Sequence, residues 1–105
     1  MRSIYKLSRY WITAYLYFAL GNIYSSQLRW AEAQQAYFNA YSLESGNPDY
    51  ALNLAVSLDH IGQYKAALEY YNVALGLADL GVPGFSTTSL VSRIQVLSGI
   101  VNSQL

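Results

Sequence analysis

The chain lacks cysteine altogether and has a single histidine, His60, among its 105 residues. The absence of cysteine excludes a disulfide framework, a thiolate nucleophile and a zinc–thiolate site. A metal site or a catalytic triad would have to be built on His60, because imidazole is the usual ligand or base. Its neighbour Asp59 points about 100° away from it on a helix, so the two do not form a base and its orienting acid. We interpret His60 as a solvent-exposed residue at the C-terminus of a helix, where it interacts favourably with the helix dipole.

Charged residues are also scarce, at 11% of the chain against about 25% in a typical domain. The six acids include no pair at the i, i+3 or i, i+4 spacing that brings two carboxylates together on a helix. The glycines at 81 and 84 are not followed by the lysine of a phosphate-binding loop. We therefore expect no enzyme activity, no cofactor and no metal.

The net charge is zero, so no strong overall field draws the chain to nucleic acid. The N-terminal part, residues 1–30, carries four cations and no acid, whereas residues 31–80 carry all six acids and one lysine. Four cations cannot hold many phosphates, even beside Tyr5 and Tyr10, and we expect no nucleic-acid partner. A basic aromatic tail near a membrane or on a protein partner fits equally well.

A long uncharged run of nineteen residues lies between Arg9 and Arg29, close to the length of a membrane-spanning helix. Its strongly apolar part ends at Leu20, and the polar residues that follow favour a helix of the folded domain. A membrane-associated protein anchored or inserted through residues 1–24 stays open as an alternative. The apolar run behind basic residues also has the length of a targeting-peptide core.

Apolar residues form 53% of the chain, and eleven residues are tyrosine. With so few charges, not every face of the domain carries a charged coat. Either tyrosines cover the surface with polar tips on apolar rings, or a partner or a second copy covers one face. Composition leaves both possibilities open.

Residues 47–77 have the pattern of a helix, a tight turn and a second helix. Asn47 is a suitable N-cap, and Pro48 suits the first helical position, where no amide hydrogen bond is lost. Gly62 supplies the turn. Apolar residues at helical spacing mark two facing stripes, which are Leu54, Ala55 and Leu58 in the first helix and Ala67, Leu68, Tyr71, Ala74 and Leu75 in the second.

The same pattern occurs earlier in the chain with a period of about 34 residues, and a fixed period of this size indicates stacked helical units. Pairs that keep size or apolarity are Leu20 with Leu54, Gly21 with Ala55, Tyr24 with Leu58, Ala33 with Ala67, Tyr37 with Tyr71 and Ala40 with Ala74. On these residues, together with Tyr17 and Ala51, positions 14–81 resemble the tetratricopeptide repeat (TPR) family. The first turn, at residues 25–29, departs from the second because it lacks a glycine.

We predict an all-α chain that forms a short TPR-like superhelix of two helix-turn-helix repeats plus a C-terminal capping helix. Residues 1–13 would be a basic aromatic extension, helical and continuous with the first repeat helix. Repeat one takes residues 14–47, repeat two 48–81, and the linker and capping helix 82–105.

The last helix follows a break at residues 78–86 that contains two glycines and a proline. Ser86 is expected to cap it, and Phe85 to pack on Leu90. Its inner stripe is Leu90, Ile94, Leu97 and Val101, while Val91, Val96 and Ile100 lie off that stripe. Apolar residues on an outer edge indicate a longer array or a surface that meets a partner.

The TPR resemblance implies a concave groove that is lined by the first helix of each repeat and holds a segment of a partner polypeptide. The matching positions are Tyr15, Phe18, Asn22 and Ser25 in repeat one, and Asp49, Leu52, Asn53, Val56 and Asp59 in repeat two. Phe18 and Leu52 stand where a carboxylate-clamping member has cations, which disfavours a chaperone-tail clamp. We expect a preference for apolar or aromatic segments, with Asp49 and Asp59 offering places for basic residues.

Residues 47–64 also resemble, more narrowly, the C-terminal repeat region of bacterial proteins associated with type IV or mannose-sensitive pilus biogenesis, and Phe85 and Arg93 fit that group. This likeness implies a partner in an envelope-spanning assembly. The localisation itself stays unknown, and a cytoplasmic or membrane-associated bacterial protein is favoured over a secreted one.

The function predicted from these residues is a non-catalytic protein–protein interaction module, an adaptor or scaffold. A structural homo-oligomer is the remaining rival, because two repeats are fewer than the roughly three usually needed for stability. Dimerisation through the N-terminal or the last helix would bury the spare apolar surface.

Overall fold

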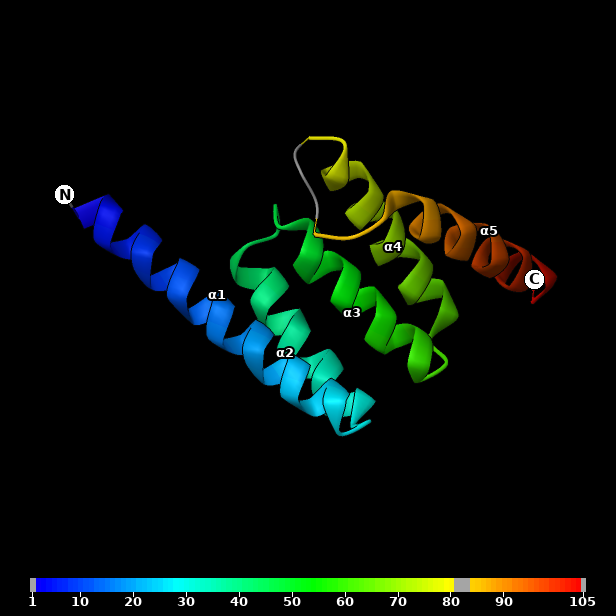
Figure 1. Cartoon of the computed structure of the whole chain (residues 1–105), viewed down its shortest axis with the longest axis horizontal. Coiled ribbons are helices and arrows are strands. Elements are labelled where there is room, and N and C mark those ends of the chain that lie inside the picture. The colour runs from blue at the N-terminus through cyan, green and yellow to red at the C-terminus, as the bar shows by residue number, and fades with distance from the viewer. Residues whose placement is uncertain (1, 81–83, 105) are drawn as a thin grey trace.

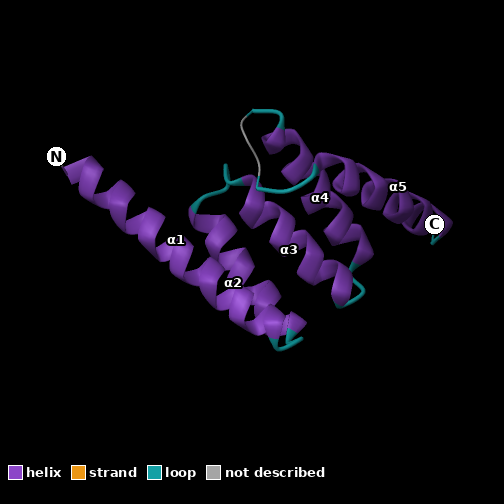
Figure 2. Cartoon of the chain, viewed as in Figure 1, coloured by secondary structure: helices purple, strands orange, loops and turns teal. Residues whose placement is uncertain are grey.

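The computed structural model describes residues 2–80 and 84–104, with the side chains of residues 2–8 outside that description. The chain is all-α, as predicted, and these residues form five helices and no strand (Figures 1 and 2). They are α1 (Arg2–Ser26), α2 (Trp30–Leu43), α3 (Pro48–His60), α4 (Tyr64–Ala78) and α5 (Thr87–Ser103). Residues 81–83 of the predicted break lie outside the described residues.

Consecutive helices pack against one another: α1 on α2, α2 on α3, α3 on α4 and α4 on α5. The result is an elongated molecule of 52 × 31 × 23 Å. The N-terminal half of α1 projects beyond the other helices at one end, and α5 lies at the opposite end (Figure 1). Because α1 runs unbroken from Arg2 to Ser26, it is the longest of the five described helices.

The start of α3 has the predicted cap. The Asn47 side chain accepts hydrogen bonds from the backbone amides of Asp49 at 2.9 Å and Tyr50 at 3.3 Å. Pro48 occupies the first helical position. Two amides that the helix itself cannot satisfy therefore find a partner, and α3 begins at a fixed residue.

The turns inside the two helix pairs are built alike. In the second, Gly62 has φ +81°, its amide donates to Asp59 O, and the Gln63 amide donates to Leu58 O. In the first, Leu28 has φ +60°, its amide donates to Ser25 O, and the Arg29 amide donates to Tyr24 O. Both are Schellman motifs, and they lie one repeat period apart. Leu28 thus adopts, as a non-glycine residue, the left-handed conformation that Gly62 adopts without steric cost.

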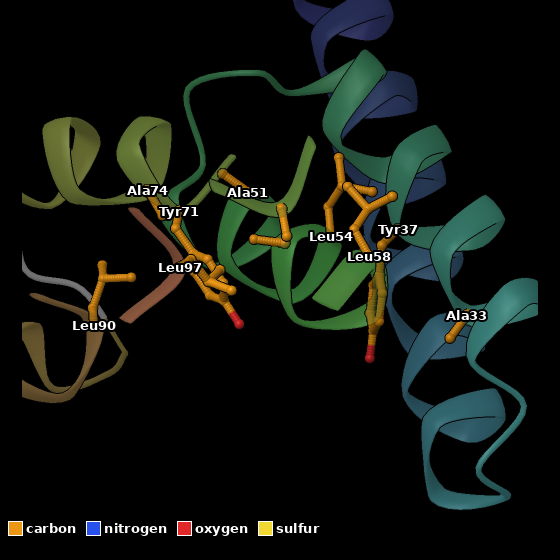
Figure 3. Close-up of a cluster of buried hydrophobic side chains, with 11 residues drawn as sticks. Ala33, Tyr37, Ala51, Leu54, Leu58, Tyr71, Ala74, Leu90 and Leu97 are labelled. Atoms are coloured by element: carbon orange, nitrogen blue, oxygen red, sulfur yellow. The ribbon is translucent and has the colours of Figure 1, made fainter. Parts of the chain in front are cut away.

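The core lies between the helix pairs (Figure 3). Its members from α2, α3 and α4 include the fully buried alanines Ala33, Ala51, Ala55, Ala67 and Ala74. Tyr37, Leu54 and Tyr71 fill the space that these small residues leave between the helices. Small side chains let the backbones approach closely, and the few large ones supply most of the buried apolar area.

The last helix covers α4 with Leu90 and Leu97, which are buried in the same core. Phe85, the residue before the cap, packs on this core, which contains Leu90. Ser86 is at the N-cap position, but within the described residues its side chain accepts no capping hydrogen bond, so that part of the prediction was wrong. Val91 and Val96 remain exposed on the outer side of α5.

Candidate partner-binding groove

A hollow between α1 and α3 brings four of the nine predicted groove residues together. We call it the α1/α3 hollow, and its volume is about 430 Å³. From the predicted set it contains Tyr15, Phe18, Asp49 and Asn53. Its other lining residues are Trp11, Asn47, Tyr50 and Gly84.

Aromatic rings form the wall and the floor of this hollow. The Trp11 and Tyr15 rings stack with centroids 6.4 Å apart, and the two residues are 60% and 55% exposed. Phe18 lies deeper, 4.9 Å from the Tyr50 ring and 5.8 Å from the Tyr37 ring. The floor is therefore held by core packing, whereas the Trp11–Tyr15 pair is available to a ligand.

Asp49 supplies the negative charge of the hollow. It is in the first turn of α3, and its carboxylate is so close to the chain at Gly84 that a Cβ there would lie 2.9 Å from Oδ1. Asn53 donates to the Asp49 carbonyl at 2.8 Å. Burial, followed by the charges of Glu44, Tyr15 and Asp49, raises the pKa of Tyr50. The rings thus surround an anionic position suited to a cation.

Leu52 and Val56 do not line the α1/α3 hollow. They face the last helix in a second hollow, the α3/α5 hollow, of about 310 Å³. Its other lining residues are Tyr71, Phe85, Ser86, Ser89, Leu90 and Arg93. The predicted groove is therefore divided into two hollows, and α5 flanks the one that contains Leu52 and Val56.

Asp59 already has an intramolecular cation. Arg93 of α5 makes a bidentate contact with the Asp59 carboxylate. Its Nε donates to Oδ2 at 2.7 Å, and its Nη2 donates to Oδ1 at 2.6 Å. Tyr71 of α4 also donates to Oδ2, at 2.9 Å. Partial burial alone would raise the pKa of Asp59, but the hydrogen bonds from Arg93 and Tyr71 outweigh it and hold the pKa below its ordinary value. Asp59 thus joins three helices, and Arg93 stands where a basic residue of a partner was expected.

Asn22 and Ser25 are tied to α2 through Tyr37. The Tyr37 hydroxyl donates to Asn22 Oδ1 at 2.7 Å and shares a hydrogen bond of 2.9 Å with Ser25 Oγ. Burial raises the pKa of Tyr37, against the lowering effect of the Ser25 hydrogen bond. Ser25–Tyr37 and Asp59–Tyr71 are equivalent pairs in the first and second helix pairs, displaced by one repeat period. This position in each helix pair is a polar joint between helices.

Trp11 and Tyr50 are lining residues that the sequence-based site did not include. Trp11 precedes Tyr15 by four residues and Phe18 by seven, so extending the helical stripe by one turn would have found it. Tyr50 gave no such signal, because it is a buried core residue of α3 that also lines the hollow.

His60 stacks on Trp30 at the opposite end of α3. The two rings are parallel within 1°, with centroids 3.7 Å apart, and His60 is exposed. The described residues contain no group of three histidine or acidic side chains that could hold a metal. The ring packing of His60 on Trp30 joins the end of α3 to the start of α2.

A comparison with protein families finds none that matches the chain, and a comparison with curated proteins finds no match either. The TPR resemblance and the narrower pilus-biogenesis likeness therefore stay predictions from the residues. No helix in the described part of the chain is long and apolar enough to cross a membrane.

Proposed function

We propose that the chain is a non-catalytic interaction module of TPR-like architecture that binds a segment of a partner polypeptide in the α1/α3 hollow. An aromatic or aliphatic side chain of the partner packs on Trp11 and Tyr15. A neighbouring lysine or arginine of the partner pairs with Asp49. In the narrower reading of the sequence, this partner is a component of an envelope-spanning assembly.

The TPR-like architecture is supported by features that recur from the first helix pair to the second at equivalent positions. The two turns share their hydrogen bonds, and the two polar joints use Tyr37 and Tyr71 in the same place. Buried alanines occur in the cores of both helix pairs. Such repetition is expected of two copies of one helix-turn-helix unit followed by a covering helix.

The observation that supports binding most strongly is the exposed Trp11–Tyr15 stack beside the Asp49 carboxylate. Tryptophan and tyrosine dominate the energetic centres of interfaces, because they bury large area with few rotatable bonds. A carboxylate among rings favours lysine or arginine through both ion pairing and cation–π attraction. Phe18, packed against Tyr50 and Tyr37, gives this surface a rigid base.

A displayed library of random peptides, selected on the full chain, tests this proposal. Selected peptides should pair an aromatic or aliphatic residue with a lysine or arginine. Trp11→Ala should weaken their binding at least about tenfold, as for an interface anchor. Asp49→Asn should weaken only the peptides that carry the cation, and should reduce the salt dependence of their binding.

Tyr10→Ala and Leu80→Ala are matched controls, because both side chains are exposed and lie outside the lining of the hollow. They should leave peptide affinity unchanged. If the Trp11→Ala and Asp49→Asn variants bind the selected peptides as well as the wild type does, the α1/α3 hollow is not the binding site.

A further inference from the structure

The first helix has a second exposed apolar face, which the groove does not use. Ile12, Leu16, Leu20 and Ile23 follow one another at spacings of four, four and three residues. Their exposed fractions are 49%, 61%, 38% and 54%. We call these four residues the α1 ridge. It is about 120° around the helix from Trp11, Tyr15 and Phe18, at 3.6 residues per turn.

A hollow borders this ridge on the side of α2. The α1/α2 hollow has a volume of about 360 Å³, and Leu20 belongs both to it and to the ridge. Its walls are Tyr17 and Tyr24 of α1 and the small residues Ala31 and Ala36 of α2, with Glu32, Gln35 and Asn39 along the rim. Ridge and hollow together make one contiguous face of the first helix pair.

The chain itself shows what covers a face of this composition. The counterparts of Tyr17, Leu20 and Tyr24 in the second helix pair are Ala51, Leu54 and Leu58. In α3 these three residues are 0%, 0% and 8% exposed, because α3 packs on both α2 and α4. Among the described helices α1 packs extensively only on α2, so the corresponding face of α1 is covered on one side and open on the other. A helix of similar apolar character is therefore its fitting occupant.

The ridge is complementary to itself. In chain order it is Ile, Leu, Leu, Ile, so an antiparallel copy places Ile12 opposite Ile23 and Leu16 opposite Leu20. The four residues span about 16 Å at 1.5 Å per residue. No charged residue occurs between Arg9 and Arg29, so pairing the ridges desolvates no charge of α1. A two-fold interface requires such a self-complementary patch.

We propose that the chain forms a two-fold dimer in which the α1 ridges of two copies pack antiparallel, each beside the other's α1/α2 hollow. The contact leaves the groove surface uncovered, because Trp11 and Tyr15 lie on a different face of α1 and Asp49 belongs to α3. The dimer therefore does not depend on peptide binding, and the failure of either proposal is recognisable separately.

Sedimentation equilibrium of the full chain tests the dimer. The wild type should sediment as a dimer. The double variant Leu16→Glu with Ile23→Glu should raise the dissociation constant by at least about 100-fold, because it buries unpaired carboxylates in the contact. The matched control Val91→Glu with Val96→Glu changes two exposed residues of α5 and should stay dimeric. A monomeric wild type, or a double variant that dimerises like the wild type, would overturn the proposal.

The orientation is tested with milder substitutions that do not put folding at risk. Because the chain has no cysteine, Ile12→Cys and Ile23→Cys each introduce a single thiol. A short bis-maleimide should link a mixture of the two variants into dimers faster than it links either variant alone. Equal rates for the mixture and the separate variants would exclude the antiparallel pairing of the ridges.

Discussion

Gly21 lies against the face of the Tyr37 ring. A Cβ at residue 21 would be 2.5 Å from Cε1 and 2.6 Å from Cδ1 of that ring. Tyr37 has little freedom to retreat, because it is buried, packed against Phe18 and hydrogen-bonded to Asn22 and Ser25. The close approach of α1 to α2 thus depends on the missing side chain.

Gly21→Ala should consequently destabilise the fold by about 1 to 2 kcal/mol, because overpacking outweighs the gain in helix propensity. Gly99→Ala is the matched control, since a Cβ there meets nothing within 4 Å and the residue is inside α5. It should raise the free energy of unfolding by about 0.5 to 1 kcal/mol. Urea denaturation measures both, and equal effects of the same sign would contradict the role of Tyr37.

The first turn should become more stable when its left-handed residue is glycine. Leu28 has φ +60° and is 73% exposed, so Leu28→Gly removes backbone strain while losing little buried surface. We expect a gain of about 0.5 to 1 kcal/mol, after the greater entropy of glycine in the unfolded chain is subtracted. Gly62→Ala should show the opposite sign. Thermal denaturation followed by circular dichroism reports both, and a loss of stability in Leu28→Gly would count against the strain.

The two predicted caps should differ in energetic effect. Asn47→Ala removes the acceptor of two amide hydrogen bonds and should cost about 1 kcal/mol of stability. Ser86→Ala changes a side chain that makes no cap bond within the described residues, and it should be close to neutral. The midpoint of urea denaturation measures the stability of both variants. An equal loss of stability in Ser86→Ala and Asn47→Ala would contradict the difference between the two caps.

The Asp59 joint should make stability fall in acid. The pKa of Asp59 is lowered in the folded state. Ionised Asp59 therefore adds to the free energy of unfolding above the ordinary carboxyl pKa of about 3.9, and this stabilisation disappears as the pH falls through the lower folded pKa. Asp59→Asn should flatten this part of the pH profile of the unfolding free energy. Glu69→Gln, at an exposed position of α4, is the control and should keep the wild-type slope in that range.

Arg93 should also be required for folding stability, because it pairs with Asp59. The Asp59 side chain is 12% exposed in the intact protein, and Arg93→Ala removes its cation. The expected cost is about 1 to 2 kcal/mol at neutral pH, moderated because the Arg93 side chain is 41% exposed. Arg93→Lys should recover only part of this loss, because an ammonium cannot make the two-armed contact. Full recovery by lysine would show that charge alone is sufficient.

The helices, the Asn47 cap and the Gly62 turn were predictable because each depends on residues close together in the chain. The core positions of Leu54, Ala67 and Tyr71 in α3 and α4 were predictable in the same way, from helical spacing. The candidate site was predictable only in part. Tyr15 and Asp49 do line one hollow. The α3/α5 hollow and the Arg93–Asp59 pair depend on how the last helix packs, which spacing along the chain does not determine.

Extensive packing in the described chain joins only helices that follow one another in the sequence. Such a chain has a low contact order, so folding requires few long loop closures and should be fast for its length. We predict that the α3–α4 pair, which has a helix packed on either side, folds first and that order spreads from it toward both ends. Amide hydrogens of α1 and α5 should then exchange with solvent when these end helices open locally. Amide hydrogens of α3 near Leu54 should exchange only when the whole chain unfolds.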